Sequence, residues 1–273
     1  MMTTSLVFHS DAELLEGPVF DQENGLLYFV SILEGLVYCY HCATKQILSI
    51  KLESPVSCIY IQGAKQVLVA SKEGFFEIDF NTLQKRAIFQ IEIEDNVRYN
   101  DGIMDAAGRI LIGTMGYPEV QDHIGNVFSY HQGTSKVLIE NTTISNGLAF
   151  SADHKFLYFI DTPTKKVAKY HYDLNSGEVQ FDSYVIHFTE DGSPDGMCMD
   201  NKGMLYIAEW GGSCVSKWNP ENGKKLARYD LPCPNVTSCC FDDKANLYVT
   251  TAKSEYENDI LGGGVFYIEL NKI

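Results

Sequence analysis

The sequence predicts an all-β fold, a six-bladed β-propeller with four-stranded blades, and three observations support this prediction. The chain of 273 residues contains six copies of one pattern, in which a short apolar run, a polar turn and a second apolar run follow one another. The copies recur every 40 to 48 residues, a length typical of propeller blades. The 16 Tyr and 15 Phe favour pleated strands, and apolar stripes with a helical period are missing.

The repeat is clearest at the central residue of its second apolar run. These six residues are Tyr28, Leu68, Leu111, Tyr158, Tyr206 and Tyr248. After Tyr158 the outer strands of a blade can also be read, because the run DTPTKKVAKYHYD leads through the turn LNSGE into the run VQFDSYVIHF. Turns of this kind between alternating runs are typical of β-hairpins.

The two ends of the chain complete the predicted ring. The segment TSLVFHS precedes the first repeat without a blade of its own, and the last repeat, ending in GGVFYIEL, is one strand short. We therefore expect the N-terminal strand to pair into the last blade, which removes two open sheet edges at once. The expected organisation is a single domain over residues 1–273.

Composition and charge exclude several classes of partner. The formal net charge of −15 argues against nucleic acid or an anionic membrane, since both attract basic surfaces. The first residues have no basic segment followed by a long apolar one, and no apolar run approaches the roughly 18 residues of a membrane span. The eight cysteines, including the C-x-x-C of Cys39 and Cys42, are expected to be reduced thiols in strands. These features predict a cytoplasmic protein, and nothing in them demands more than a monomer.

Six equivalent polar positions stand four residues before the last apolar residue of each first run. They are Glu16, Ser57, Asn100, Asn146, Asp195 and Thr237. Equivalent positions of a propeller lie at equal height around one central channel, and four of these six carry carboxylate or carboxamide oxygens. Such oxygens are the ligands that calcium, magnesium and manganese prefer, and since no His takes part, a preference for zinc does not follow from the ligand type. The alternative is that these residues satisfy backbone groups in turns, as Asn, Asp and Ser often do.

Several motifs resemble one known family along essentially the whole chain. The segments EGPVF, RYNDG, SNGLAFSADHKFLYFIDT, PDGMCMD and TSCCFDDKANLYVTTA are similar to those of the regucalcin (senescence marker protein), gluconolactonase and luciferin-regenerating enzyme family. The resemblance implies a six-bladed propeller with one catalytic divalent cation in its channel. It also implies the hydrolysis of sugar lactones, with aryl or organophosphate esters as further substrates of some members.

The resemblance also implies site residues. The family's metal ligands correspond to Glu16, Asn146 and Asp195, three of the positions found from the repeats. Its substrate-contacting Arg and Asn correspond to Arg98 and Asn100.

Two further positions of the substrate site follow from the same motifs. Asp101 belongs to RYNDG and is expected to support the substrate-binding residues. A family acid that follows the GTM segment corresponds by count to Pro118, with Glu119 beside it, so Glu119 is the candidate for that substrate-binding acid.

The implied function is a metal-dependent lactonase that opens a sugar lactone or a related ester. One divalent cation (calcium, zinc, magnesium or manganese) would polarise the ring carbonyl and activate water, and Asp195 would act as general base. Serine-nucleophile and phosphate-loop chemistry are disfavoured, because the chain lacks a G-x-S-x-G elbow and a glycine-rich loop followed by Lys and Ser or Thr.

Two other classes of function are retained as alternatives. One is a calcium-binding regulatory protein of the regucalcin type without significant turnover, and the intact RYNDG motif favours the enzyme over it. The other is a propeller that serves only protein contacts, which the oxygen ligands in register disfavour. Both tryptophans, Trp210 and Trp218, are expected to pack inside the fifth blade and not to bind a sugar. Of the two, Trp210 at a strand end is the better placed to face the site.

Overall fold

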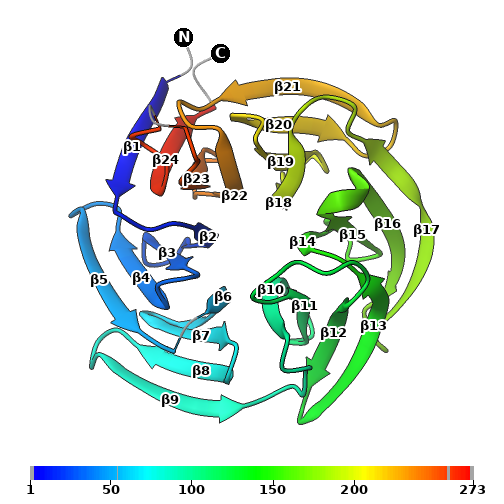
Figure 1. Ribbon diagram of the computed structural model, residues 1–273, viewed down its shortest axis with the longest axis horizontal. Helices are drawn as coiled ribbons and strands as arrows, with labels where there is room; N and C mark the ends of the chain where they lie inside the picture. The colour runs from blue at the N-terminus through cyan, green and yellow to red at the C-terminus, as the bar shows by residue number, and fades with distance from the viewer. Residues whose placement is uncertain (1–2, 54, 257–258, 271–273) are drawn as a thin grey trace.

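Short strands form a ring of small sheets around a common axis, so the all-β prediction is confirmed and the arrangement is that of a propeller (Figure 1). The structure is a computed structural model that describes residues 3–53, 55–256 and 259–270. These residues form 24 strands and a single 3-10 helix, η1 (Thr162–Thr164). In this described part of the chain, no helix is long and apolar enough to cross a membrane.

Four sheets each contain four consecutive antiparallel strands. The first consists of β2 (Leu15–Asp21), β3 (Leu26–Ser31), β4 (Leu36–His41) and β5 (Gln46–Lys51). The second consists of β6 (Val56–Gly63), β7 (Gln66–Ser71), β8 (Gly74–Asp79) and β9 (Gln84–Phe89). The third consists of β10 (Val97–Met104), β11 (Ile110–Gly116), β12 (Gly125–His131) and β13 (Thr134–Thr142). The fourth consists of β14 (Ser145–Phe150), β15 (Phe156–Asp161), β16 (Lys166–Asp173) and β17 (Glu178–His187).

The fifth sheet has eight strands. Its first four strands in the chain are β18 (Ser193–Met199), β19 (Leu205–Trp210), β20 (Cys214–Asn219) and β21 (Lys224–Asp230). The others are β22 (Asn235–Phe241), β23 (Leu247–Ala252), β24 (Gly264–Glu269) and the N-terminal β1 (Thr3–His9). One residue pair, Trp210 with Asn235, joins the two groups through β19 and β22. The pairing thus gives four separate four-stranded sheets and one of eight strands, and the count of six blades stays a prediction.

The predicted closure of the ring by the N-terminal strand is confirmed. β1 pairs antiparallel with β24, with Thr4 opposite Ile268 and Ser5 opposite Tyr267. The first and last strands of the chain therefore lie side by side in one sheet (Figure 1). This pairing satisfies the backbone groups that β24 would otherwise expose along its edge.

The core lies between neighbouring sheets. All six residues of β3 are buried, and its residues Tyr28 and Val30 share an apolar cluster with Val67 and Val69 of β7 in the next sheet. A strand covered on both faces reads as a continuous apolar run instead of an alternating one, which explains the second apolar run of each repeat. These packed layers hold the innermost strands β2, β6, β10, β14, β18 and β22 around the axis (Figure 1).

Candidate functional site

Each innermost strand has an irregularity in its pairing at the same place along its length. The register shifts lie between Glu16 and Val19, Val56 and Ile59, Tyr99 and Gly102, Asn146 and Leu148, Pro194 and Met197, and Val236 and Ser238. A β-bulge inserts an extra residue, bends the strand and turns a side chain in a new direction. The six polar positions found from the repeats all lie at or inside these shifts.

The bulges explain the steps Asp101-Gly102, Asn146-Gly147 and Asp195-Gly196, which lie within β10, β14 and β18 and not in hairpin turns. A Cβ atom on Gly147 of β14 would stand 2.7 Å from the carbonyl oxygen of Asp195 on β18. On Gly196, a Cβ atom would clash with Oγ of Ser238 on β22. Glycine is therefore required at these positions because neighbouring innermost strands approach closely.

A cavity of about 240 Å³ lies on the side of the bulges where the innermost strands begin. Its polar lining consists of Glu16, Arg98, Asn100, Asn146, Thr162, Ser193 and Asp195. Its apolar lining consists of Leu14, Ile32, Met115, Ile144 and Trp210. Most of the predicted site residues thus meet in one concave space that is smaller than the roughly 300–1,000 Å³ of sites for drug-sized ligands.

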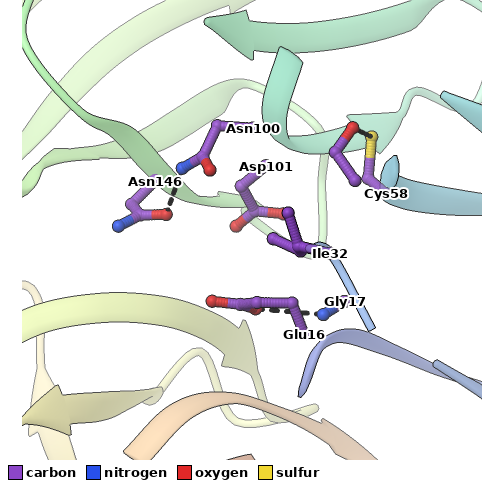
Figure 2. Close-up of a pocket in the computed structure, with 8 residues that line it drawn as sticks. Glu16, Gly17, Ile32, Cys58, Asn100, Asp101 and Asn146 are labelled. Carbon is purple, nitrogen blue, oxygen red and sulfur yellow. Dashed lines mark hydrogen bonds between the residues drawn. The ribbon is translucent and has the colours of Figure 1, made fainter. Parts of the chain in front are cut away.

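Asp101 lies deeper, beside Glu16. The two residues line a small space with Asn100 and Asn146, and Figure 2 shows these side chains converging from β2, β10 and β14. The bulge in β10 allows the consecutive residues Asn100 and Asp101 both to reach the channel. A separate cavity of about 340 Å³ follows on the far side of the bulges, where the lining is mainly apolar and sulfur-containing.

A chain of hydrogen bonds joins the predicted substrate-binding residues to the predicted metal ligands. Nη1 of Arg98 donates to Oδ1 of Asn100 at 2.8 Å. Nδ2 of Asn100 donates to Oδ1 of Asn146 at 2.7 Å, the bond drawn between these two residues in Figure 2. Nδ2 of Asn146 then donates to Oγ1 of Thr162 at 2.9 Å. Oγ1 of Thr162 donates to the carbonyl oxygen of Pro194 at 2.8 Å.

The last two bonds fix how the Asn146 amide is turned. Because the only proton of the Thr162 hydroxyl is used on Pro194, this oxygen can only accept from Asn146. The amide nitrogen of Asn146 therefore faces Thr162, and its oxygen faces Asn100 and the channel. The chain of bonds also connects Asn146 to the residue directly before Asp195.

Burial and mutual repulsion disfavour the charged forms of the acids. Burial, and then the charge of Asp101, raises the pKa of Glu16 to about 8. Burial, followed by the charges of Glu16 and Asp101, raises the pKa of Asp195 well above its usual value. Burial raises the pKa of Asp101 to about 6. Burial also lowers the pKa of Arg98 to about 10, although the charges of Glu16 and Asp195 oppose that shift.

The donor set fits a hard divalent cation. Asp195 is 5% exposed, and its Oδ1 is buried without a hydrogen-bond partner, which leaves a ligand atom free. A cation between Glu16 and Asp195 would remove the repulsion that raises their pKa values. Within the described residues no group of three or more His, Cys, Asp or Glu side chains has metal-binding geometry. A cation would therefore need the amide oxygen of Asn146 besides the two carboxylates, and an all-oxygen set suits calcium or magnesium.

The structure does not bring every predicted residue together. Glu119 is exposed in the segment after β11 and does not line the cavity. Trp218 is buried in its sheet with Nε1 donating to Oγ of Ser216, as the sequence predicts. Trp210, expected to pack but better placed to face the site, is exposed at the end of β19 and lines the cavity. Thr162 is not among the predicted residues, because it stands after the second apolar run of its repeat, outside the register that identifies the others.

Comparisons with known proteins identify the family of the chain. Residues 14–253 match the model of the family described as "SMP-30/Gluconolactonase/LRE-like region". Regucalcin from Danio rerio is 33% identical over 245 residues, which cover 88% of this chain and 83% of that protein. The putative sugar lactone lactonase YvrE from Bacillus subtilis (strain 168) is 33% identical over 258 residues, which cover 91% of this chain and 88% of that protein.

Solved structures give the same result. A luciferin-regenerating enzyme superposes with a TM-score of 0.91 at 25% identity, covering 99% of this chain and 96% of that one. A calcium-binding protein, regucalcin from Agrobacterium tumefaciens, superposes with a TM-score of 0.90 at 26% identity, covering 98% of this chain and 93% of that one. Because the family model matches residues 14–253, which are most of the chain, the protein belongs to the SMP-30/gluconolactonase/LRE-like family.

Proposed function

We propose that the protein is a divalent-metal-dependent hydrolase that opens the ring of a small-molecule lactone. The observation that supports this proposal is the hydrogen-bond chain from Arg98 through Asn100 to Asn146, because it joins the residues proposed to bind the substrate to a residue proposed to bind the cation. A lactonase-type function is supported by the family of the chain and by the name of its relative from Bacillus subtilis.

In this proposal Glu16, Asn146 and Asp195 hold the cation. When bound, the cation supplies Lewis-acid polarisation of the lactone carbonyl and lowers the pKa of water beside it. Asp195 accepts a proton from the attacking water and returns it to the ring oxygen as the carbon–oxygen bond of the ring breaks. Arg98 and Asn100 hold the substituents of the ring, and Thr162 keeps the oxygen of Asn146 turned towards the channel.

We also propose a substrate class, a domain organisation and a cellular location for the protein. The substrate is a sugar lactone or a related ester, with Asp101 as a further residue of the substrate site. The chain acts as one domain over residues 1–273, with the eight-stranded sheet counted as two blades of six. It works as a cytoplasmic monomer without a nucleic-acid or membrane partner.

A metal-replacement experiment tests the proposal. The protein is stripped with a chelator, and acid release from glucono-, galactono- and xylonolactone is followed while calcium, magnesium, manganese or zinc is restored. Turnover that is lost on stripping and returns with one of these cations supports the proposal. Absence of turnover with every cation and every lactone contradicts it.

The second candidate function is calcium binding for regulation, without significant turnover. The names of several relatives and of one solved structure favour it, since they describe regucalcin and a calcium-binding protein. Calcium binding alone requires Glu16, Asn146 and Asp195 but not Arg98. Tight calcium binding by a protein that cleaves no lactone, with affinity unchanged in Arg98→Met, would favour this function over the hydrolase.

A further inference from the structure

The guanidinium group of Arg98 is buried but only partly used by the protein. Arg98 is 6% exposed, and Nη1 makes both of its hydrogen bonds, to the carbonyl oxygen of Tyr99 at 3.0 Å and to Oδ1 of Asn100 at 2.8 Å. Nε and Nη2 have no hydrogen-bond partner in the described part of the chain, and Arg98 lines the 240 Å³ cavity. Three of its five N–H groups are thus available to a ligand, and two of them, on Nε and Nη2, lie parallel on one edge of the planar guanidinium.

Arg98 also lacks a carboxylate partner at contact distance. No described Asp or Glu oxygen lies within 4.0 Å of its nitrogens. Glu16 and Asp195 act on it from farther away, and both are assigned to the cation in the proposed function. A buried cation without an anion at contact distance is costly, so an anionic group of a ligand would be favoured beside Arg98.

The surroundings make Arg98 the place where such an anion binds. No other Arg, Lys or His is among the described residues that line the cavity. The apolar lining of the cavity consists of Leu14, Ile32, Met115, Ile144 and Trp210. Glu119, the candidate for a substrate-binding acid, is exposed and does not line the cavity, so it adds no negative charge to the cavity wall.

We propose that the substrate carries a carboxylate group that binds to the free edge of the Arg98 guanidinium. The substrate class is therefore a lactone of a dicarboxylic acid, in which one carboxyl group closes the ring and the second remains ionised. The two oxygens of a carboxylate match the parallel N–H groups of arginine, a geometry that lysine does not offer. This inference rests on the proposed function, because the rest of the substrate is taken from it.

The first test compares lactones that differ in one group. γ-Carboxy-γ-butyrolactone is compared with its carboxamide, and the γ-lactone of glucaric acid with that of gluconic acid, which carries a hydroxymethyl group in place of the carboxylate. We expect kcat/KM to be about tenfold to 100-fold higher for the carboxylate member of each pair, the range expected for a charge-assisted hydrogen bond.

Variants of Arg98 test whether its guanidinium causes this preference for the carboxylate. Arg98→Lys keeps the positive charge but reduces the ratio of the two kcat/KM values, and Arg98→Met abolishes the preference. Arg86→Lys, in an exposed ion pair with Glu77, is the matched control and leaves the ratio unchanged.

A second measurement detects binding of the carboxylate group in the absence of turnover. Oxocyclopentanecarboxylate, a ring ketone that cannot be hydrolysed, is titrated by calorimetry into wild type and Arg98→Met. Binding to wild type alone supports the inference, and equal binding or no binding to both overturns it. If the neutral lactones are hydrolysed as fast as the carboxylates, the inference fails and the hydrolase stands. If no lactone is hydrolysed with any cation, the proposed hydrolase fails, and the calorimetric result alone decides the inference.

Discussion

Nδ2 of Asn100 donates a hydrogen bond to Oδ1 of Asn146 at 2.7 Å, and this bond joins β10 of one sheet to β14 of the next. The same Nδ2 also donates to the carbonyl oxygen of Ser145 at 2.8 Å, so the Asn100 amide is held in place by the neighbouring sheet. Substrate binding at Arg98 and Asn100 is therefore expected to be mechanically coupled to the oxygen that Asn146 offers to a cation.

Removing the Thr162 hydroxyl should weaken the site without breaking the fold. Thr162→Val keeps the shape of the side chain but leaves Nδ2 of Asn146 without its acceptor and the carbonyl of Pro194 without its donor. Because residues that orient metal ligands typically affect affinity and activity by 10- to 100-fold, we expect losses of about that size in cation affinity and kcat/KM. Thr164→Val in the same 3-10 helix is the control, since Thr164 is exposed and its hydroxyl donates to the carbonyl oxygen of Asp161, outside the chain of bonds that holds Asn146. Calcium titration and initial rates measure both, and equal losses in the two variants would contradict the positioning role.

The metal-free protein should lose stability as the pH rises, partly through Glu16. The pKa of Glu16 is about 8 in the folded protein, against 4.5 for a freely solvated glutamic acid, so folding favours the protonated form. The stabilising contribution is complete below pH 4.5 and is lost as the pH rises through about 8, with a slope of up to about 1.4 kcal/mol per pH unit for one proton.

Glu16→Gln isolates this contribution. Because Gln cannot ionise, the metal-free variant should unfold at a higher temperature than metal-free wild type at about pH 9, above the folded pKa, and should show a weaker dependence on pH. With a saturating divalent cation the order should reverse, since only the carboxylate is a strong ligand. Thermal unfolding with chelator and with calcium measures both effects. An identical pH dependence of the two metal-free proteins would contradict the role of Glu16.

A methyl group at Gly147 should disturb both the packing and the site. The Cβ of Gly147→Ala would stand 2.7 Å from the backbone oxygen of Asp195, 2.8 Å from Ile160 and 2.9 Å from Met197, so β14 and β18 must separate. We expect a destabilisation of about 1–3 kcal/mol, the usual cost of overpacking, together with weaker cation binding. Gly63→Ala is the control, since its Cβ would meet only the Gln66 side chain at 3.7 Å. Denaturant unfolding of both variants checks this, and equal stability would show that the strands can move apart freely.

The sequence predicts the all-β fold, the pairing of the N-terminal strand into the last blade and the level of the site along the central channel. All three follow from the pattern of the repeats. Glu16, Asn146 and Asp195 could be identified because equivalent positions of the repeats converge on one axis. The reason for glycine at Gly147 and Gly196 could not be predicted from the sequence, since the crowding at these positions comes from neighbouring innermost strands.

Other features depend on contacts between repeats, so the sequence of a single repeat does not predict them. Thr162 bonds to Asn146 in its own sheet and to Pro194 in the next, and no local pattern marks both partners. The pair of Trp210 and Asn235 joins two groups of strands through a single bridge at the ends of β19 and β22. A pattern of strand lengths and turns contains no information about such a contact.

The rate of lactone hydrolysis by Asp195→Asn is the decisive measurement for the proposed mechanism. Initial rates are measured for wild type, Asp195→Asn and the exposed control Asp191→Asn, each stripped with chelator and then supplied with the cation that activates wild type. We predict that the cation restores turnover in wild type and in the control, and that the rate of Asp195→Asn stays about 100- to 10,000-fold lower, the range for loss of a general base. Circular dichroism and unfolding temperature establish that the variant is folded. Near-normal turnover by Asp195→Asn, or full activity of the stripped wild type, would contradict the mechanism.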